Sequence, residues 1–136
     1  YRFDLQQNLR RTQILFLDVD SPGKEIYMMH GVDAGQVLQL AKLVSFKEGE
    51  VNFLKIVESD HMRFALLAFD KNSVLPEHPA PGDAMIFALE GQANLSYEGR
   101  DYVLKAGDQF KFDKGGKHLL STGDSRFIMA LVIEKE

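Results

Sequence analysis

The chain has no cysteine among its 136 residues. This absence excludes disulfides, zinc sites built on thiolates and cysteine nucleophiles. No apolar run approaches the roughly 18 residues that a membrane-spanning helix needs. Residues 13–18 are too short, and too acidic at their flanks, for a signal peptide. We therefore expect a cytoplasmic protein with no membrane attachment, which the lack of cysteine fits.

The chain also lacks an excess of positive charge. Its net charge is −4 at pH 7, and its isoelectric point is about 5.6. This balance argues against a nucleic-acid partner, because binding along a phosphate backbone needs a basic surface. It leaves open a small polar or anionic ligand in a local pocket. Neither a G-x-S-x-G nucleophile elbow nor a P-loop is present.

The part of the chain that follows residue 50 reads as β-structure almost without interruption. Short apolar segments alternate with Gly, Asn and Asp turns at a spacing of roughly 8–12 residues, which is typical of a sandwich or barrel. Tyr97-Glu98-Gly99-Arg100 is predicted to form a tight hairpin. The predicted strands cover residues 53–57, 62–69, 84–89, 93–97, 102–104, 109–112, 118–121 and 127–133.

The first part of the chain has a different pattern. Residues 1–11 are polar and predict a short helix or an extended arm, whereas residues 14–19 predict a strand. The apolar pattern of residues 33–44 permits a short helix or a strand with one irregular turn. We therefore divide the chain into an N-terminal extension, residues 1–43, holding an arm and the first strand or strands, and a barrel domain, residues 44–136.

Two short motifs carry the strongest signal. The first is Pro76-x-His78 followed by Ala88-Leu89-Glu90-Gly91, and the second is Gly107-Asp108-x-Phe110 followed by Gly115-x2-His118. They resemble the two motifs of the cupin superfamily, over about residues 44–133. The resemblance implies an all-β fold, the double-stranded β-helix or cupin/jelly-roll barrel, here with a short N-terminal extension. It also implies a pocket at the wider mouth of the barrel.

In the family this pocket commonly holds a metal through four residues, and only two of them are present here. His78 takes the first histidine position and His118 the histidine of the second motif, while Ala80 and Ala84 replace the other two donors. The nearest third donor is Asp83, which would complete a two-histidine, one-carboxylate set for Fe, Mn, Ni or Zn. Asp83 points inward only if the backbone is irregular just before it, because a shift of one residue moves a strand side chain to the other face.

Other residues are predicted to line the pocket beside the two histidines. Alternate strand positions face the inside of a barrel, and we assign Phe64, Met85 and Phe87 to the pocket wall. Such large side chains are equally consistent with a filled hydrophobic core. A wall of Met and Phe favours a partly apolar ligand.

Three functions are consistent with these observations. The first is a cupin-fold protein that binds a small molecule between His78, His118 and the apolar wall, with or without a weakly held divalent metal. The alternative is a metal-dependent cupin enzyme of the dioxygenase, isomerase or decarboxylase type that uses His78 and His118. The third is a closed barrel with an interaction role, since a fold alone does not determine function. The resemblance also implies a homodimer in which the N-terminal arm crosses to the partner.

Overall fold

The structure, a computed structural model, describes residues 28–135. The chain divides into two compact units, residues 1–30 and 31–136, and the fold described below is that of the second unit. The predicted arm (1–11) and strand (14–19) lie outside the described residues. Residues 31–43, which we had assigned to an N-terminal extension, belong to the same unit as the barrel strands.

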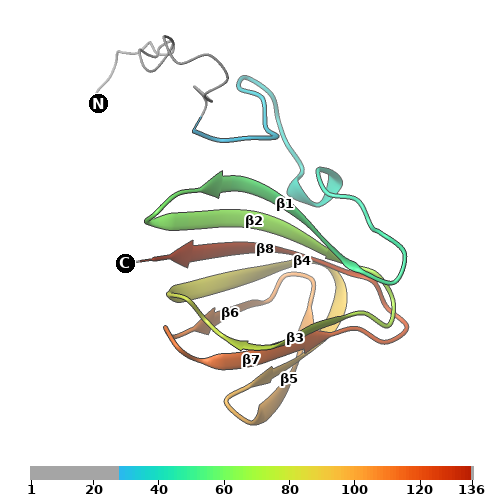
Figure 1. Ribbon diagram of the computed structural model, residues 1–136. Coiled ribbons are helices and arrows are strands. Elements are labelled where there is room, and N and C mark those ends of the chain that lie inside the picture. The colour runs from blue at the N-terminus through green and yellow to red at the C-terminus, as the bar shows by residue number, and fades with distance from the viewer. Residues whose placement is uncertain (1–27, 136) are drawn as a thin grey trace. The chain divides into compact units, whose positions relative to one another are not determined.

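The described unit is almost entirely β-structure, which confirms the predicted fold class (Figure 1). No helix within residues 28–135 is long and apolar enough to cross a membrane. A single turn of 3-10 helix, η1, precedes eight strands in this part of the chain. The elements are η1 (Leu40–Lys42), β1 (Val51–Glu58), β2 (Met62–Phe69), β3 (Val74–Pro79), β4 (Asp83–Tyr97), β5 (Arg100–Lys105), β6 (Gln109–Phe112), β7 (Lys117–Ser121) and β8 (Phe127–Glu134).

The strands form two antiparallel sheets that share the long strand β4. Sheet A contains β1, β2, β8, the first half of β4 and β6, and sheet B contains β3, β7, the second half of β4 and β5. The sequence predicted two strands separated by a turn at Glu90-Gly91, and this prediction is corrected to one bent strand with a register shift between Ala88 and Glu90. Gly91 has φ of 79°, and a Cβ on it would lie 1.8 Å from the carbonyl oxygen of Arg126. Only glycine fits where β4 bends beneath β8.

The hairpin between β4 and β5 is confirmed, whereas strand β3 was not predicted. Glu98 and Gly99 have φ of 49° and 80°, as a type I′ turn requires, and Tyr97 pairs with Arg100. β3 contains Pro76 and Pro79, which suggested a bend rather than a strand. β3 lies at the edge of sheet B, where it pairs only with β7, and an edge strand tolerates proline because one row of its N–H groups faces away from the ladder.

Apolar side chains are buried on both faces of sheet A. One cluster fills the space between the two sheets and includes Leu67, Ile86 and Met129. A second cluster lies on the opposite face, where residues 32–46 cover sheet A. The strands of sheet A are therefore apolar on both faces, so alternation alone cannot show which face points into the barrel.

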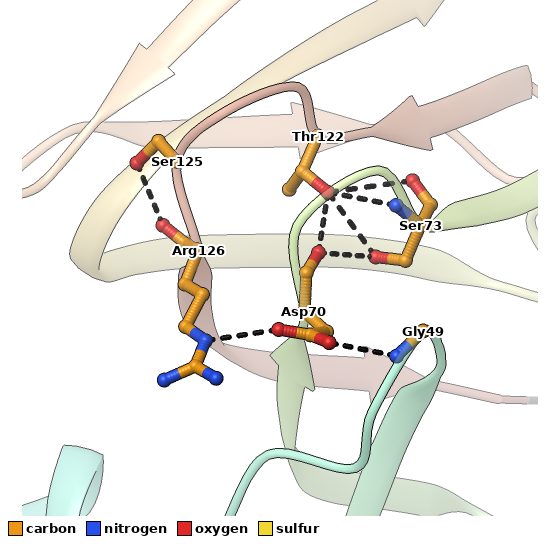
Figure 2. Close-up of polar contacts among 6 residues, drawn as sticks. All are labelled: Gly49, Asp70, Ser73, Thr122, Ser125 and Arg126. Atoms are coloured by element: carbon orange, nitrogen blue, oxygen red, sulfur yellow. Dashed lines mark hydrogen bonds and ion pairs between the residues drawn. The ribbon is translucent and has the colours of Figure 1, made fainter.

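The two ends of sheet A differ in their polar contacts. We call the end where Met62, Asp83 and Glu134 pair the histidine end, and the opposite end, where Phe69, Gly91 and Phe127 pair, the Asp70 end. Figure 2 shows the Asp70 end, where the carboxylate of Asp70 accepts hydrogen bonds from Arg126 Nε at 2.9 Å and from the N–H of Gly49 at 2.7 Å. Thr122 Oγ1 donates to the carbonyl of Asp70 and accepts the N–H of Ser73 at 3.0 Å.

Candidate functional site

A cavity of about 460 Å³ opens between the two sheets at the histidine end. Most of its lining is apolar, and the polar side chains in it are His78 and His118 from sheet B and Arg63 from sheet A. The volume and the apolar wall with a few polar groups are typical of sites for small organic ligands.

The two histidines lie together because they are cross-strand partners. His78 on β3 pairs with His118 on β7 in the antiparallel ladder, so both side chains leave the same face of sheet B. Their ring centroids are 4.3 Å apart, with the rings at 61° to one another. The sequence singled out both histidines but gave no sign of their pairing, because β3 was not predicted.

Each imidazole is oriented by a backbone carbonyl two residues earlier in the chain. The Nδ1–H of His78 donates to Pro76 O at 2.8 Å, and the Nδ1–H of His118 donates to Gly116 O at 3.0 Å. A carbonyl oxygen can only accept, so in a neutral ring the proton resides on Nδ1 and the lone pair on Nε2. The pair thus has two nitrogen acceptors available to a ligand.

His118 is the more enclosed of the two histidines. The residue is 6% exposed, and its ring stacks on that of Phe112 with the centroids 4.1 Å apart. Burial lowers the pKa of His118 below 6.5; the bond to Gly116 opposes this decrease, and the neighbouring His78 adds to it. His118 is therefore neutral at pH 7, with Nε2 as an acceptor.

A charged cluster stands on the sheet A side of the same end. Arg63 Nε and Nη2 bind the two carboxylate oxygens of Glu58 at 2.6 and 3.3 Å, and Lys135 Nζ binds the same carboxylate at 2.6 Å. Hydrogen bonds from Arg63 and Lys135 hold the pKa of Glu58 at about 2. Sequence analysis missed Arg63, although its alternation with Ala65 and Leu67 on β2 would have placed all three on one face.

Asp83 does not join the histidines. Its carboxylate accepts the N–H of Lys114 at 2.9 Å and lies 3.5 Å from Lys111 Nζ. The adjacent Ala84 lines the cavity, and successive strand side chains point to opposite faces, so Asp83 faces outward. The hydrogen bond from Lys114 and the charge of Lys111 lower the pKa of Asp83, which fits a role in tying the start of β4 to the turn after β6.

The residues of the cavity do not fit a resident metal held by three or more protein donors. The two histidines supply suitable nitrogens, but Ala80 and Ala84 line the cavity without a donor atom. Within the described part of the chain, no group of three or more His, Cys, Asp or Glu residues is placed to hold a metal ion. Two imidazoles alone form a weak site for a divalent metal.

The predicted wall residues Phe64, Met85 and Phe87 are absent from the cavity lining, and this assignment is corrected. Phe64 and Phe87 pack in the cluster beneath residues 32–46, on the other face of sheet A, and Met85 is 41% exposed. The inward positions of β4 are instead the smaller Ala84, Ile86 and Ala88. Bulk misled the assignment because Met85 and Phe87, the larger side chains in this half of β4, lie on the outer face.

Several solved structures are similar to this chain. A conserved protein of unknown function from Streptococcus pyogenes is 23% identical, with a TM-score of 0.76 over 83% of this chain and 98% of that chain. A cupin superfamily protein from Desulfitobacterium hafniense is 21% identical, with a TM-score of 0.74 over 79% of this chain and 98% of that one. A cupin 2 conserved barrel domain protein from Leptotrichia buccalis is 26% identical, with a TM-score of 0.69 over 72% and 47% of the two chains.

No curated protein is significantly similar to the chain. The family model described as "Cupin domain" matches residues 65–133, which is just over half of the chain. This match runs from the middle of β2 into β8 and includes both histidines of the cavity, and it agrees with the two-sheet barrel seen in the structure. The chain therefore belongs to the cupin domain family.

Proposed function

We propose that this protein binds a small organic molecule in the cavity between its two sheets. The observation that carries the proposal is the convergence of His78 and His118 on a cavity of about 460 Å³ with a mainly apolar wall. The apolar wall favours a ligand with an apolar body, since burial of that body contributes roughly 25 cal/mol per Å². The two imidazole nitrogens favour a ligand with a hydroxyl or N–H group, because each Nε2 needs a donor once water is displaced.

A metal-dependent cupin enzyme is the second candidate function. The bond from each Nδ1 to a backbone carbonyl favours it, because metal-binding histidines are commonly oriented in this way. The lack of a third protein donor argues against it. Elemental analysis of the purified protein beside His78→Ala tests this candidate: near-stoichiometric metal that is lost in the variant supports the enzyme. Metal-free protein after exposure to Fe, Mn, Ni and Zn excludes this candidate.

The binding function can be tested with the uncharged dye N-phenyl-1-naphthylamine, whose fluorescence rises in apolar sites. We expect the dye to bind the wild-type protein and to lose this binding in Ala84→Phe, whose ring would occupy the cavity. Ala106→Phe is the matched control, because Ala106 is exposed in the turn after β5. Circular dichroism checks that each variant folds, and Ala84→Leu provides a milder filling of the same space. Equal dye binding by all of these proteins would refute the proposal.

We also propose that the protein is a homodimer that uses the outer face of sheet A. Met62 and Met85 on that face are 38% and 41% exposed, and Met85 pairs with the half-buried Val132 in the ladder. Exposed apolar surface of this kind favours association. Light scattering coupled to size-exclusion chromatography measures the mass, and Met85→Glu should convert a dimer into a monomer.

A further inference from the structure

The wall of the cavity that faces the histidines carries a positive charge. Arg63 is the one charged side chain among the residues that line this cavity. It lies near the start of β2 in sheet A, whereas His78 and His118 belong to sheet B, so the cavity has a cation on one side and two nitrogen acceptors on the other. One end of a bound molecule would therefore lie near a cation, and the other end would lie near two nitrogen acceptors.

Arg63 keeps donors that no residue uses. A guanidinium has five N–H donors, and Glu58 engages the Nε–H and one N–H of Nη2. The group at Nη1 has no hydrogen-bond partner in the part of the chain that the structure describes. Because Glu58 holds the guanidinium from one side, the free edge is fixed in direction before any ligand arrives.

The local charge is positive although the whole chain is acidic. Glu58 is shared by Arg63 and Lys135, so two cations and one carboxylate leave one positive charge in the cluster. The net charge of the chain is −4, which means that this local excess does not reflect a generally basic surface. The carboxylate of Glu58 fixes Arg63 without neutralising the cluster.

We propose that the cavity selects an organic carboxylate whose anionic end binds Arg63 and whose apolar body carries a hydroxyl or N–H group toward His78 and His118. This inference rests on the proposed binding function and deepens it by naming the class of ligand. A carboxylate fits the planar edge of a guanidinium in a two-point arrangement, which gives geometric specificity beyond charge. The same group would be disfavoured beside the buried, neutral His118, because the lone pair on its Nε2 repels an anion.

The experiment compares two ligands that share one body. 1-Naphthylacetate and 1-naphthylacetamide differ mainly in charge, and their affinities are measured by isothermal titration calorimetry. We expect the carboxylate to bind the wild-type protein about tenfold more tightly than the amide, as a charge-assisted hydrogen bond predicts. Arg63→Met should reduce this ratio to about one. Lys47→Gln is the control, because Lys47 is an exposed cation at the Asp70 end, and it should keep the wild-type ratio.

The outcomes separate this inference from the proposed function. Equal affinity of the two ligands for the wild-type protein, or an unchanged ratio in Arg63→Met, overturns the selection of carboxylates while leaving the binding function intact. Failure of both ligands and of N-phenyl-1-naphthylamine to bind overturns the binding function itself. If Arg63→Met does not fold, the test is the salt dependence of both affinities for the wild-type protein. Added salt must weaken binding of the carboxylate and leave binding of the amide unaffected. A carboxylate affinity that does not change with salt refutes the inference.

Discussion

The two ends of the barrel use polar residues in opposite ways. At the Asp70 end, Asp70, Thr122 and Ser73 bind one another and the neighbouring backbone, and both carboxylate oxygens of Asp70 have donors (Figure 2). At the histidine end, each imidazole binds one carbonyl through Nδ1, which leaves Nε2 without a hydrogen-bond partner among the described residues. Arg63 likewise retains unused donors.

The difference supports the proposal that the histidine end binds a ligand, whereas the Asp70 end stabilises the fold. A buried polar group with all of its bonds made within the chain stabilises one conformation and offers nothing to a ligand. A polar group with spare capacity on a cavity wall costs free energy unless water or a ligand satisfies it. Both ends belong to one fold, so what distinguishes them is the number of hydrogen-bond donors and acceptors that are left without a partner among the described residues.

The most severe way to break the Asp70 end is to add a side chain at Gly91. A Cβ there would meet Arg126 O at 1.8 Å and would have to adopt φ of 79°, so Gly91→Ala should lower the free energy of unfolding by about 3 kcal/mol or prevent folding. Gly123→Ala is the control, because a Cβ on Gly123 meets nothing within 4 Å, and it should change stability by less than about 0.5 kcal/mol. Urea unfolding measures both variants, and similar midpoints for the two would contradict the close approach of β4 and β8.

The next effect is expected from Thr122, whose hydroxyl both donates and accepts at the Asp70 end. Thr122→Val keeps the shape but leaves the buried N–H of Ser73 without its acceptor, at a cost of about 1–3 kcal/mol. Thr122→Ser retains the hydroxyl and should remain close to the wild-type stability. Thermal unfolding followed by calorimetry distinguishes the variants, and equal losses for Val and Ser would assign the effect to packing rather than to the hydrogen bonds.

The corresponding change at the histidine end should cost less. His118→Phe removes one hydrogen bond, but Gly116 O still accepts the N–H of Ala80 at 3.0 Å, and a phenyl ring can stack on Phe112. We expect a loss below about 1 kcal/mol, because the polar group that disappears was only partly satisfied. A loss larger than that of Thr122→Val, measured by the same calorimetry, would contradict the division between a stabilising and a binding end.

The sequence predicted the fold well because turn residues mark most of the strands. Gly99 and its neighbours defined a hairpin, and the predicted strand 109–112 matches β6 at both ends. The predictions failed where tertiary structure overrides local pattern. Glu90-Gly91 resembles a turn but forms a bend within β4, and the prolines of β3 are tolerated only because that strand lies at an edge.

The candidate site could be predicted only in part, for a physical reason. His78 and His118 stand in recognisable motifs, but the rest of the lining depends on which face of sheet A points inward. The apolar pattern of β2 or β4 does not reveal that face. Residues 32–46 cover the outer face, so both faces of sheet A carry buried apolar side chains. Arg63 was overlooked for the same reason, since its importance follows from its place on the cavity wall rather than from its neighbours in sequence.

Acid should weaken the Asp70 end within a defined range of pH. Hydrogen bonds from the N–H of Gly49 and from Arg126 lower the pKa of Asp70 from 3.8 to about 2. Because the folded value is depressed, the carboxylate contributes stability that is fully present above pH 3.8 and is lost as the pH falls through about 2. The difference in unfolding free energy between wild type and Asp70→Asn should therefore be constant down to about pH 4 and shrink below it. Glu58→Gln is the counterpart at the histidine end, and a difference for Asp70→Asn that does not change with pH would contradict the bonding in Figure 2.

The smallest expected effect is the titration of His118 itself. Burial lowers its pKa below 6.5, so the neutral ring contributes stability that is present above pH 6.5 and is lost as the pH falls toward the folded value. NMR spectra of the Cε1–H group across this range should give a midpoint below 6.5 in the folded protein and a midpoint near 6.5 in urea. His78→Phe should raise the folded midpoint, because the charge of His78 contributes to the decrease, while burial keeps it depressed.

A midpoint at or above the value in urea would mean that His118 is charged at the pH of binding. The histidine end would then present a donor, and an anion could bind beside His118 as readily as beside Arg63.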